Sequence, residues 1–274
     1  MQKLQETKVR KSQSRKPTVI EIENVRVGAG HFTVIAGPCA LENTEQALAT
    51  ARLVQKAGAK IFRGSIFKPR TSPYSFQGVG PEGVEILRAV KKETRLLLET
   101  EILSLEQLQL LHDHVDILRI GSRNMDNYVL LQEVGKTRKP VILKRNMSAT
   151  LEEFLLAAEY IFSQGNDAVI LCERGIRTFE TYTRNTLDIL AVPALKELTH
   201  LPVIVDPSHS SGRASLVSAA SKAALAAGAD GLMIEVHPNP EKALSDGQQS
   251  LDFVEFETLM AEIKKLATLF EKTL

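Results

Sequence analysis

The strongest constraint on this chain is a regular alternation that begins at residue 32. Short runs rich in Val and Ile alternate with amphipathic segments of helical length, which is the pattern of βα units around a parallel sheet. Runs such as 203–205 and 232–234 are apolar throughout rather than at every second position, which indicates strands buried on both faces. The alternation therefore predicts an α/β fold with the strands inside and the helices outside.

Eight such units follow one another along the chain. The predicted strands are 32–36, 60–64, 95–100, 115–120, 140–144, 168–172, 202–206 and 230–235. The predicted helices are 44–57, 81–94, 104–113, 125–134, 148–164, 186–198, 214–227 and 253–272. We expect Thr44 and Ser148 to cap helix starts, and Gly58, Gly165 and Gly228 to end helices. Eight strands each followed by a helix favour a single (β/α)8 TIM barrel over a doubly wound sheet, and such barrels reach about 250 residues as one domain.

The N-terminal region differs in character from residues 32–274, which we assign to the barrel. Residues 1–17 are basic, with six Lys or Arg side chains against one acid, and predict a flexible, solvated tail. Because this segment lacks the apolar core of a secretion signal, we expect a cytoplasmic protein. Residues 18–31 are predicted to form a hairpin with its turn at 23–24, placed as a plug over the N-terminal end of the barrel.

Charge and composition exclude several other classes of protein. The 34 Lys and Arg residues against 33 Asp and Glu give a net charge of +1, and the basic excess lies in the N-terminal tail, so we expect no nucleic-acid-binding face. The most apolar segment, 214–236, is interrupted by Lys222 and Asp230, so we expect no membrane-spanning helix. Cys39 and Cys172 are expected to be free thiols, because no signal peptide directs the chain to an oxidising compartment.

Basic side chains follow the ends of the second, fourth, fifth and sixth predicted strands, at the rim where barrel enzymes carry their chemistry. They are Arg63, Lys68, Arg70, Arg119, Arg123, Lys144, Arg145 and Arg174. Guanidinium and ammonium groups bind phosphate and carboxylate, so the set predicts one or two small substrates that carry several anionic groups. The alternative is that these side chains pair with nearby acids such as Glu99 and Glu173.

Potential metal ligands follow the first, seventh and eighth predicted strands, which are neighbours once a barrel closes. Cys39, His209, Glu235 and Asp246 together offer a thiolate, an imidazole and two carboxylates to one divalent ion. This mixed donor set does not select among Mn, Fe, Co and Zn. His237 is a competing ligand, and taken singly Cys39 also fits a buried apolar position and His209 a helix cap.

Several motifs of this chain occur together and in order in a known family. They are Gly37-Pro38-Cys39, Lys68-Pro69-Arg70-Thr71-Ser72-Pro73, Gly121-Ser122-Arg123-Asn124-Met125, Leu143-Lys144-Arg145, Ile170-Leu171-Cys172-Glu173-Arg174-Gly175, Asp206-Pro207-Ser208-His209 and Leu244-Ser245-Asp246-Gly247. Over about residues 32–252 the chain resembles the 3-deoxy-D-arabino-heptulosonate 7-phosphate (DAHP) synthases, in the short type I branch related to 3-deoxy-D-manno-octulosonate 8-phosphate (KDO8P) synthase.

The resemblance implies a transferase that condenses phosphoenolpyruvate with erythrose 4-phosphate and water, the first step of the shikimate pathway to aromatic amino acids. It implies one divalent metal held by Cys39, His209, Glu235 and Asp246. It implies phosphoenolpyruvate contacts from Arg63, Arg123, Lys144 and Arg174, and sugar-phosphate contacts from Lys68, Arg70 and Thr71. Either Glu101 orients the attacking water or Lys68 donates a proton to the aldehyde, or both act only through their charge. The family analogy further suggests a homodimer or homotetramer.

Three rival interpretations remain open at this point. A KDO8P synthase would use arabinose 5-phosphate, and we expect Lys-Ala-Asn-Arg-Ser-Ser in its acceptor loop, where this chain has Lys68-Pro69-Arg70-Thr71-Ser72. A metal-dependent hydrolase would release phosphate from the enol without an aldehyde. A non-catalytic barrel would only bind a phosphorylated metabolite.

Three residues, Ser65, Ile66 and Asn146, depart from the family pattern and affect loop shape near the substrate.

Overall fold

The computed structural model describes residues 4–12, 14 and 16–274. Within these residues eight parallel strands close into a barrel, in the order β10-β3-β4-β5-β6-β7-β8-β9. The strands are β3 (Thr33–Gly37), β4 (Ile61–Arg63), β5 (Leu97–Glu101), β6 (Ile117–Ile120), β7 (Val141–Lys144), β8 (Val169–Glu173), β9 (Val203–Val205) and β10 (Gly231–Glu235). Each overlaps its predicted strand, so the predicted (β/α)8 barrel is confirmed.

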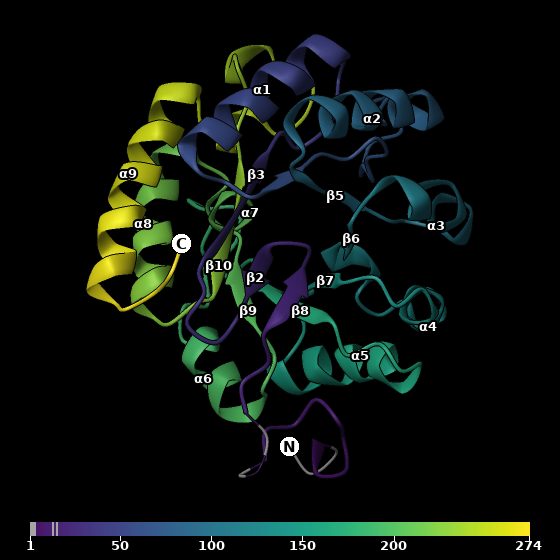
Figure 1. Cartoon of the computed structure of the whole chain (residues 1–274), viewed down its shortest axis with the longest axis vertical. Coiled ribbons are helices and arrows are strands. Elements are labelled where there is room, and N and C mark those ends of the chain that lie inside the picture. The colour runs from purple at the N-terminus through teal and green to yellow at the C-terminus, as the bar shows by residue number, and fades with distance from the viewer. Residues whose placement is uncertain (1–3, 13, 15) are drawn as a thin grey trace.

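Helices surround the strands on the outside of the barrel (Figure 1). They are α1 (Thr44–Ala57), α2 (Gly83–Thr94), α3 (Leu105–Leu111), α4 (Tyr128–Lys136), α5 (Leu151–Ser163), α6 (Ala191–Leu198), α8 (Ala214–Ala226) and α9 (Phe253–Leu269). A short helix, α7 (Pro207–Ser211), follows β9 directly. No helix in the described part of the chain combines the length and apolarity needed to span a bilayer.

Two predicted capping residues are wrong by one or two positions, because neighbouring side chains make the caps. Asn43, not Thr44, caps α1, since its side chain accepts a hydrogen bond from the backbone of Gln46. Thr150, not Ser148, caps α5, where Thr150 and Glu153 form a capping box. The predicted helix 186–198 begins only at Ala191, so residues 174–190 form a long loop at the rim of the barrel.

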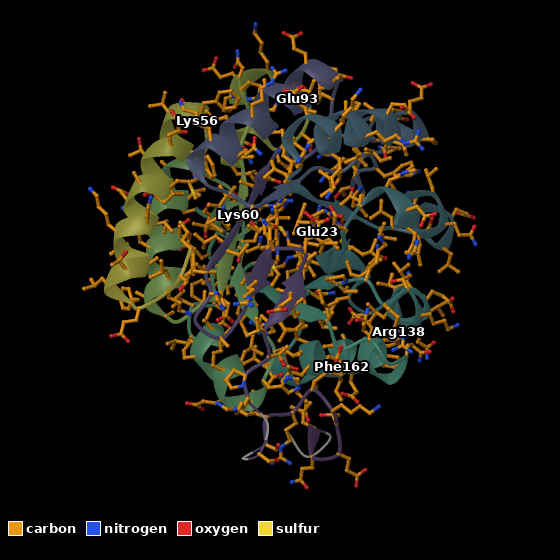
Figure 2. The ribbon with its side chains drawn as sticks, viewed as in Figure 1. Glu23, Lys56, Lys60, Glu93, Arg138 and Phe162 are labelled. Carbon is orange, nitrogen blue, oxygen red and sulfur yellow. The ribbon has the colours of Figure 1, made fainter. Side chains whose placement is uncertain are left out.

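The predicted N-terminal hairpin closes one end of the barrel. Strands β1 (Ile20–Ile22) and β2 (Val25–Val27) pair antiparallel, and side chains alternate between buried and exposed along both. The buried side chains Ile20, Ile22, Val25 and Val27 form one apolar cluster with at least one residue from every barrel strand. Figures 1 and 2 show the hairpin over the centre of the ring, with Glu23 of its turn labelled there. The functional cavity therefore opens at the opposite end.

The described residues of segment 1–17 do not form the solvated tail that the sequence predicted. Leu4 and Val9 are buried in the main core rather than exposed. The backbone of Val9 donates a hydrogen bond to Glu159 of α5 at 3.0 Å, and the backbone of Lys11 donates to the carbonyl of Leu198 at 2.9 Å. Two apolar side chains and these hydrogen bonds therefore fasten the segment to the barrel. Lys3 and Arg15, two of its basic residues, lie outside the described residues.

Candidate active site at the carboxyl ends of the strands

A cavity of about 390 Å³ opens at the carboxyl ends of the strands. Among the described residues that line it, eight are basic: Lys68, Arg70, Arg119, Arg123, Lys144, Arg174, Arg177 and Arg184. The acidic residues of its wall are Glu101 and Asp246. A cavity with this excess of positive charge attracts anionic ligands.

The predicted metal ligands come together at the floor of this cavity. Cys39 follows β3, His209 lies in α7, Glu235 ends β10, and Asp246 caps a short 3-10 helix, η6 (Gly247–Gln249). One ligand atom from each residue lies within 4.8 Å of those from the other three. The juxtaposition follows from the topology, because β10 pairs with both β3 and β9.

The four side chains fit a divalent ion. Cys39 Sγ lies 3.1 Å from Asp246 Oδ2, and His209 Nε2 lies 3.4 Å from Glu235 Oε1. Ligand atoms that bind a common ion at about 2.0–2.3 Å are separated from one another by distances similar to these two. Glu235 Oε1 is buried without a hydrogen bond, although Arg63 Nη2 lies 3.1 Å away, so it keeps lone pairs for a metal ion. His209 Nδ1 lies 2.8 Å from Asp206 Oδ2, so the carboxylate behind the ring directs Nε2 toward the other ligands.

The pKa values of two of these side chains also favour a bound cation. Burial, together with the carboxylates of Glu235 and Asp246, raises the pKa of the Cys39 thiol to about 12. Burial lowers the pKa of His209 to about 4, which keeps the imidazole in its neutral, ligating form. A divalent ion supplies the positive charge that turns a buried thiol into a thiolate ligand.

His237, the competing metal ligand, is excluded from this cluster. Its Nε2 lies 3.4 Å from Glu42 Oε1, and its Nδ1 accepts a hydrogen bond from the backbone of Asn239 at 3.1 Å. The prediction that it competes for the metal is therefore wrong. Cys39 and Cys172 are both buried free thiols, as predicted.

Arg174 presents unpaired donors beside the cavity. Its side chain is only 4% exposed, and its Nη2 donates a hydrogen bond to the carbonyl of His209 at 3.2 Å. Its Nε and Nη1 are buried without a hydrogen-bond partner. Such donors are costly to bury unless a ligand accepts hydrogen bonds from them, so Arg174 is suited to bind an anion.

Two members of the predicted basic rim do not reach the cavity wall. Arg63 is completely buried, and its Nη2 lies 3.1 Å from Glu235 Oε1, beneath the metal ligands. Arg145 points away from the cavity, with its Nη1 2.9 Å from Glu173 and 2.8 Å from Asp188. For Arg145 the alternative interpretation, pairing with a nearby acid, is the correct one.

Glu101 and Arg119 form a buried network on the cavity wall. Arg119 donates hydrogen bonds to Glu99 at 2.6 Å, to Glu101 at 3.1 Å and to Ser65 at 2.8 Å. Burial by itself raises the pKa of Glu101, but the charges of Arg119 and Lys68 lower it to about 2. Glu101 is therefore a carboxylate at neutral pH, able to accept a proton or orient water.

The loop that begins at Lys68 brings its basic side chains to the same cavity. Arg70 Nη1 donates a hydrogen bond to Ser245 Oγ at 2.6 Å and lies 4.0 Å from Asp246 Oδ1. Burial lowers the pKa of Lys68, yet the nearby Cys39 and Glu101 outweigh it and raise that pKa above its usual value. Lys68 is therefore a protonated, buried cation.

Sequence reasoning missed two arginines of the cavity wall. Arg177 and Arg184 lie on the long loop after β8, where no strand end or motif marked them. Arg184 Nη1 donates a hydrogen bond to Gln249 Oε1 at 2.9 Å and lies 3.6 Å from Asp246 Oδ1. The available signal was the length of this loop, because long loops at this end of a barrel carry function.

The chain is similar to proteins of known name. A family model described as the DAHP synthetase I family matches residues 6–272. A phospho-2-dehydro-3-deoxyheptonate aldolase of Thermotoga maritima is 54% identical over 250 residues, which cover 91% of this chain and 74% of that protein. A 2-dehydro-3-deoxyphosphooctonate aldolase of Syntrophobacter fumaroxidans is 31% identical over 261 residues, covering 89% of this chain and 90% of that protein.

Solved structures show the same similarity in three dimensions. The crystal structure of a DAHP synthase from Thermotoga maritima matches with a TM-score of 0.95 at 50% identity, covering 97% of this chain and 78% of that one. A truncated form of the 3-deoxy-D-arabino-heptulosonate 7-phosphate synthase from the same organism matches with a TM-score of 0.88 at 48% identity, covering 94% and 95%. The similarity thus spans the barrel and the loops that build the site.

Proposed function

The chain belongs to the DAHP synthetase I family, and from this premise we propose that it condenses phosphoenolpyruvate with erythrose 4-phosphate and water. The products are 3-deoxy-D-arabino-heptulosonate 7-phosphate and phosphate, and the reaction is the first step of the shikimate pathway. The observation that carries the proposal is the pairing of a four-ligand metal cluster with a strongly cationic cavity. One substrate carries a carboxylate and a phosphate and the other carries a phosphate, so their charges match the cavity.

Phosphoenolpyruvate binds to Arg123, Lys144 and Arg174. All three line the cavity, and the unpaired donors of Arg174 support the assignment most directly. Lys144 is held in place by an ion pair with Asp206, the carboxylate that also contacts His209. Arg63, predicted to bind the same substrate, contributes its charge from beneath Glu235.

The phosphate of the sugar binds to Lys68, Arg70 and Thr71. These residues share one loop and line the cavity next to Asp246. Holding both anions at fixed positions offsets their mutual repulsion and converts an encounter in solution into a positioned reaction. Because Arg70 of this loop lies next to Asp246, a sugar phosphate held by the loop has its aldehyde close to the metal ligands.

Cys39, His209, Glu235 and Asp246 hold one divalent ion, either Mn, Fe, Co or Zn. When bound, the ion supplies a Lewis acid that takes up negative charge at the aldehyde oxygen. The protein residues supply the rest of the chemistry.

C3 of the enol attacks the aldehyde carbon, a carbon–carbon bond forms, and Lys68 donates a proton to the aldehyde oxygen. Its raised pKa keeps Lys68 protonated at neutral pH, so the proton to be donated is present. Water then adds at C2, and Glu101, ionised because its pKa is about 2, orients that water and accepts its proton. The bond between C2 and the phosphate oxygen breaks last, as the C2 hydroxyl passes its proton to the leaving phosphate, and the cations that bound the phosphate stabilise it as it leaves.

An assay of the purified protein with each aldose, with and without a chelator, tests the proposal. We expect turnover with erythrose 4-phosphate to exceed turnover with arabinose 5-phosphate, and the chelator to abolish it. Faster turnover of arabinose 5-phosphate would instead support the KDO8P synthase interpretation. Phosphate release without an aldehyde would indicate a hydrolase, and no turnover with added metal would indicate a binding protein.

The assembly is a homodimer or homotetramer in the cytoplasm. Neighbouring apolar side chains on α4 and α5 support self-association: Val129 is 62% exposed, and Tyr128 stacks on Tyr160 with ring centroids 4.4 Å apart. The two free thiols are compatible with a reducing compartment. Light scattering of the eluted protein measures the subunit number, and a monomer would contradict the proposed assembly.

A further inference from the structure

Gln249 connects the cavity wall to one of the metal ligands. Its Nε2 donates a hydrogen bond to Glu235 Oε2 at 2.7 Å, and its Oε1 accepts one from Arg184 Nη1 at 2.9 Å. The side chain is completely buried, as is that of Glu235. We propose that Gln249 is a positioning residue that fixes the carboxylate of Glu235 for metal binding, and that its loss weakens the binding of the metal. This inference rests on the metal site of the proposed function.

The orientation of the Gln249 amide is set by its two partners. A guanidinium group can only donate hydrogen bonds, so Arg184 must face the amide oxygen. Gln249 and Glu235 Oε2 lie 2.7 Å apart, and a carboxylate can only accept. The NH2 group of Gln249 must therefore face Glu235, and the flipped amide would lose both hydrogen bonds.

The two oxygens of Glu235 consequently have different environments. Oε2 is held by Gln249, whereas Oε1 has no hydrogen bond and lies 3.1 Å from Arg63 Nη2 and 3.4 Å from His209 Nε2. Oε1 is the oxygen that faces the other ligands. Without Gln249, the carboxylate could rotate about its terminal torsion, and Oε2 would lose a charge-assisted hydrogen bond.

The backbone around Gln249 fixes its distance from the metal site. Gln249 ends η6, and the ligand Asp246 caps the same turn, with the backbone of Gln249 donating to the carbonyl of Asp246 at 3.2 Å. A Cβ on Gly247 would lie 2.0 Å from the carbonyl of Pro240, so this turn packs tightly against the preceding segment. One rigid turn therefore carries a metal ligand and also holds the side chain of a second ligand.

The test is a titration of the metal-free protein with Co²⁺ alone, with affinity measured by competition against a chelator. Gln249→Met keeps the volume of the side chain but removes both hydrogen bonds. Groups that orient metal ligands contribute about 10–100-fold to metal affinity, so we expect a loss of that size in this variant. The absorption of the Cys39 thiolate–cobalt pair should persist at saturating metal, because Cys39 itself is unchanged.

The neighbouring Gln248 provides a matched control. It lies on the same turn but is exposed, so Gln248→Met should bind Co²⁺ within about twofold of the original protein. If Gln249→Met does not fold, Gln249→Asn serves instead, because its shorter amide cannot reach both partners, and the same loss is expected. A Gln249 variant that folds and binds Co²⁺ as tightly as the Gln248 control would overturn the inference alone. Failure of the unsubstituted protein to bind Co²⁺ would overturn the metal site of the proposed function.

Discussion

The two ends of the barrel use the same strands for opposite purposes. At the amino-terminal end, side chains from every strand meet the hairpin in an apolar cluster that also includes the buried Cys172. At the carboxyl end, five of the eight strands end in a buried charged residue: Arg63, Glu101, Lys144, Glu173 and Glu235. Burying charge is costly unless each group is paired, so this end depends on ion pairs and on its ligands. Stability is thus expected to come from the first end and chemistry from the second.

The largest effect on the chemistry of the carboxyl end is expected from removing a proposed metal ligand. We expect Cys39→Ala to lower kcat about 1000-fold or more, because a missing thiolate removes the charge stabilisation at the aldehyde oxygen. Thermal unfolding of the chelated protein should change far less than the activity, since the substitution removes only one buried sulfur atom. Steady-state kinetics with added Mn²⁺ measures the first effect and calorimetry the second. Activity near that of the original protein would mean that the thiol is only a packing residue.

At the opposite end, Ile20→Ala should have the reverse effect. Ile20 is 4% exposed in the apolar cluster, and truncating a buried Ile costs about 2–3 kcal/mol of the free energy of unfolding. The KM values for both substrates should stay unchanged. The adjacent Glu21 is exposed, so Glu21→Ala is the control and should lie within about 0.5 kcal/mol of the original protein. Equal denaturation midpoints for the two variants would disprove the role of the hairpin.

Much of this division could be predicted from the sequence. Continuous apolar runs identified all eight barrel strands, because burial on both faces is a local property of the sequence. The clustering of the predicted metal ligands could be foreseen because strand order determines which loops are neighbours. The misassigned Arg145 shows the limit of this reasoning: it follows Lys144 by one residue, and successive side chains on a strand face opposite ways.

Other features depended on long-range contacts that leave no local pattern. Arg184 lies in a loop without periodicity, and its contacts with Gln249 and Asp246 join segments about sixty residues apart. The burial of Leu4 and Val9 depends on where α5 and α6 lie, which two isolated apolar residues in a basic segment do not reveal. Features of this kind require the folded chain.

Substituting a residue that is proposed to bind a substrate anion, but not the metal, should have a smaller effect on activity. Arg174→Met should raise the KM for phosphoenolpyruvate about 10–100-fold, because each hydrogen bond to a charged group contributes about 1.5–3 kcal/mol. The affinity for Co²⁺ should stay within a few-fold, since Arg174 hydrogen-bonds to the backbone carbonyl of His209 and not to its imidazole. An unchanged KM would remove Arg174 from the phosphoenolpyruvate site.

The smallest effect should separate the two substrates. Arg70→Ala is expected to raise the KM for erythrose 4-phosphate about tenfold, because Arg70 is partly exposed and its charge is screened by water. The KM for phosphoenolpyruvate should change less than twofold. Initial rates with each substrate varied in turn decide the matter, and a larger effect on phosphoenolpyruvate would reverse the assignment of this loop.

The most direct test of the account is the number of Co²⁺ ions that the metal-free protein binds and the absorption that accompanies binding. The account predicts one ion per chain, with a thiolate–cobalt band that disappears in Cys39→Ala. Binding of no ion, or a band that persists in that variant, would contradict a shared site for Cys39, His209, Glu235 and Asp246.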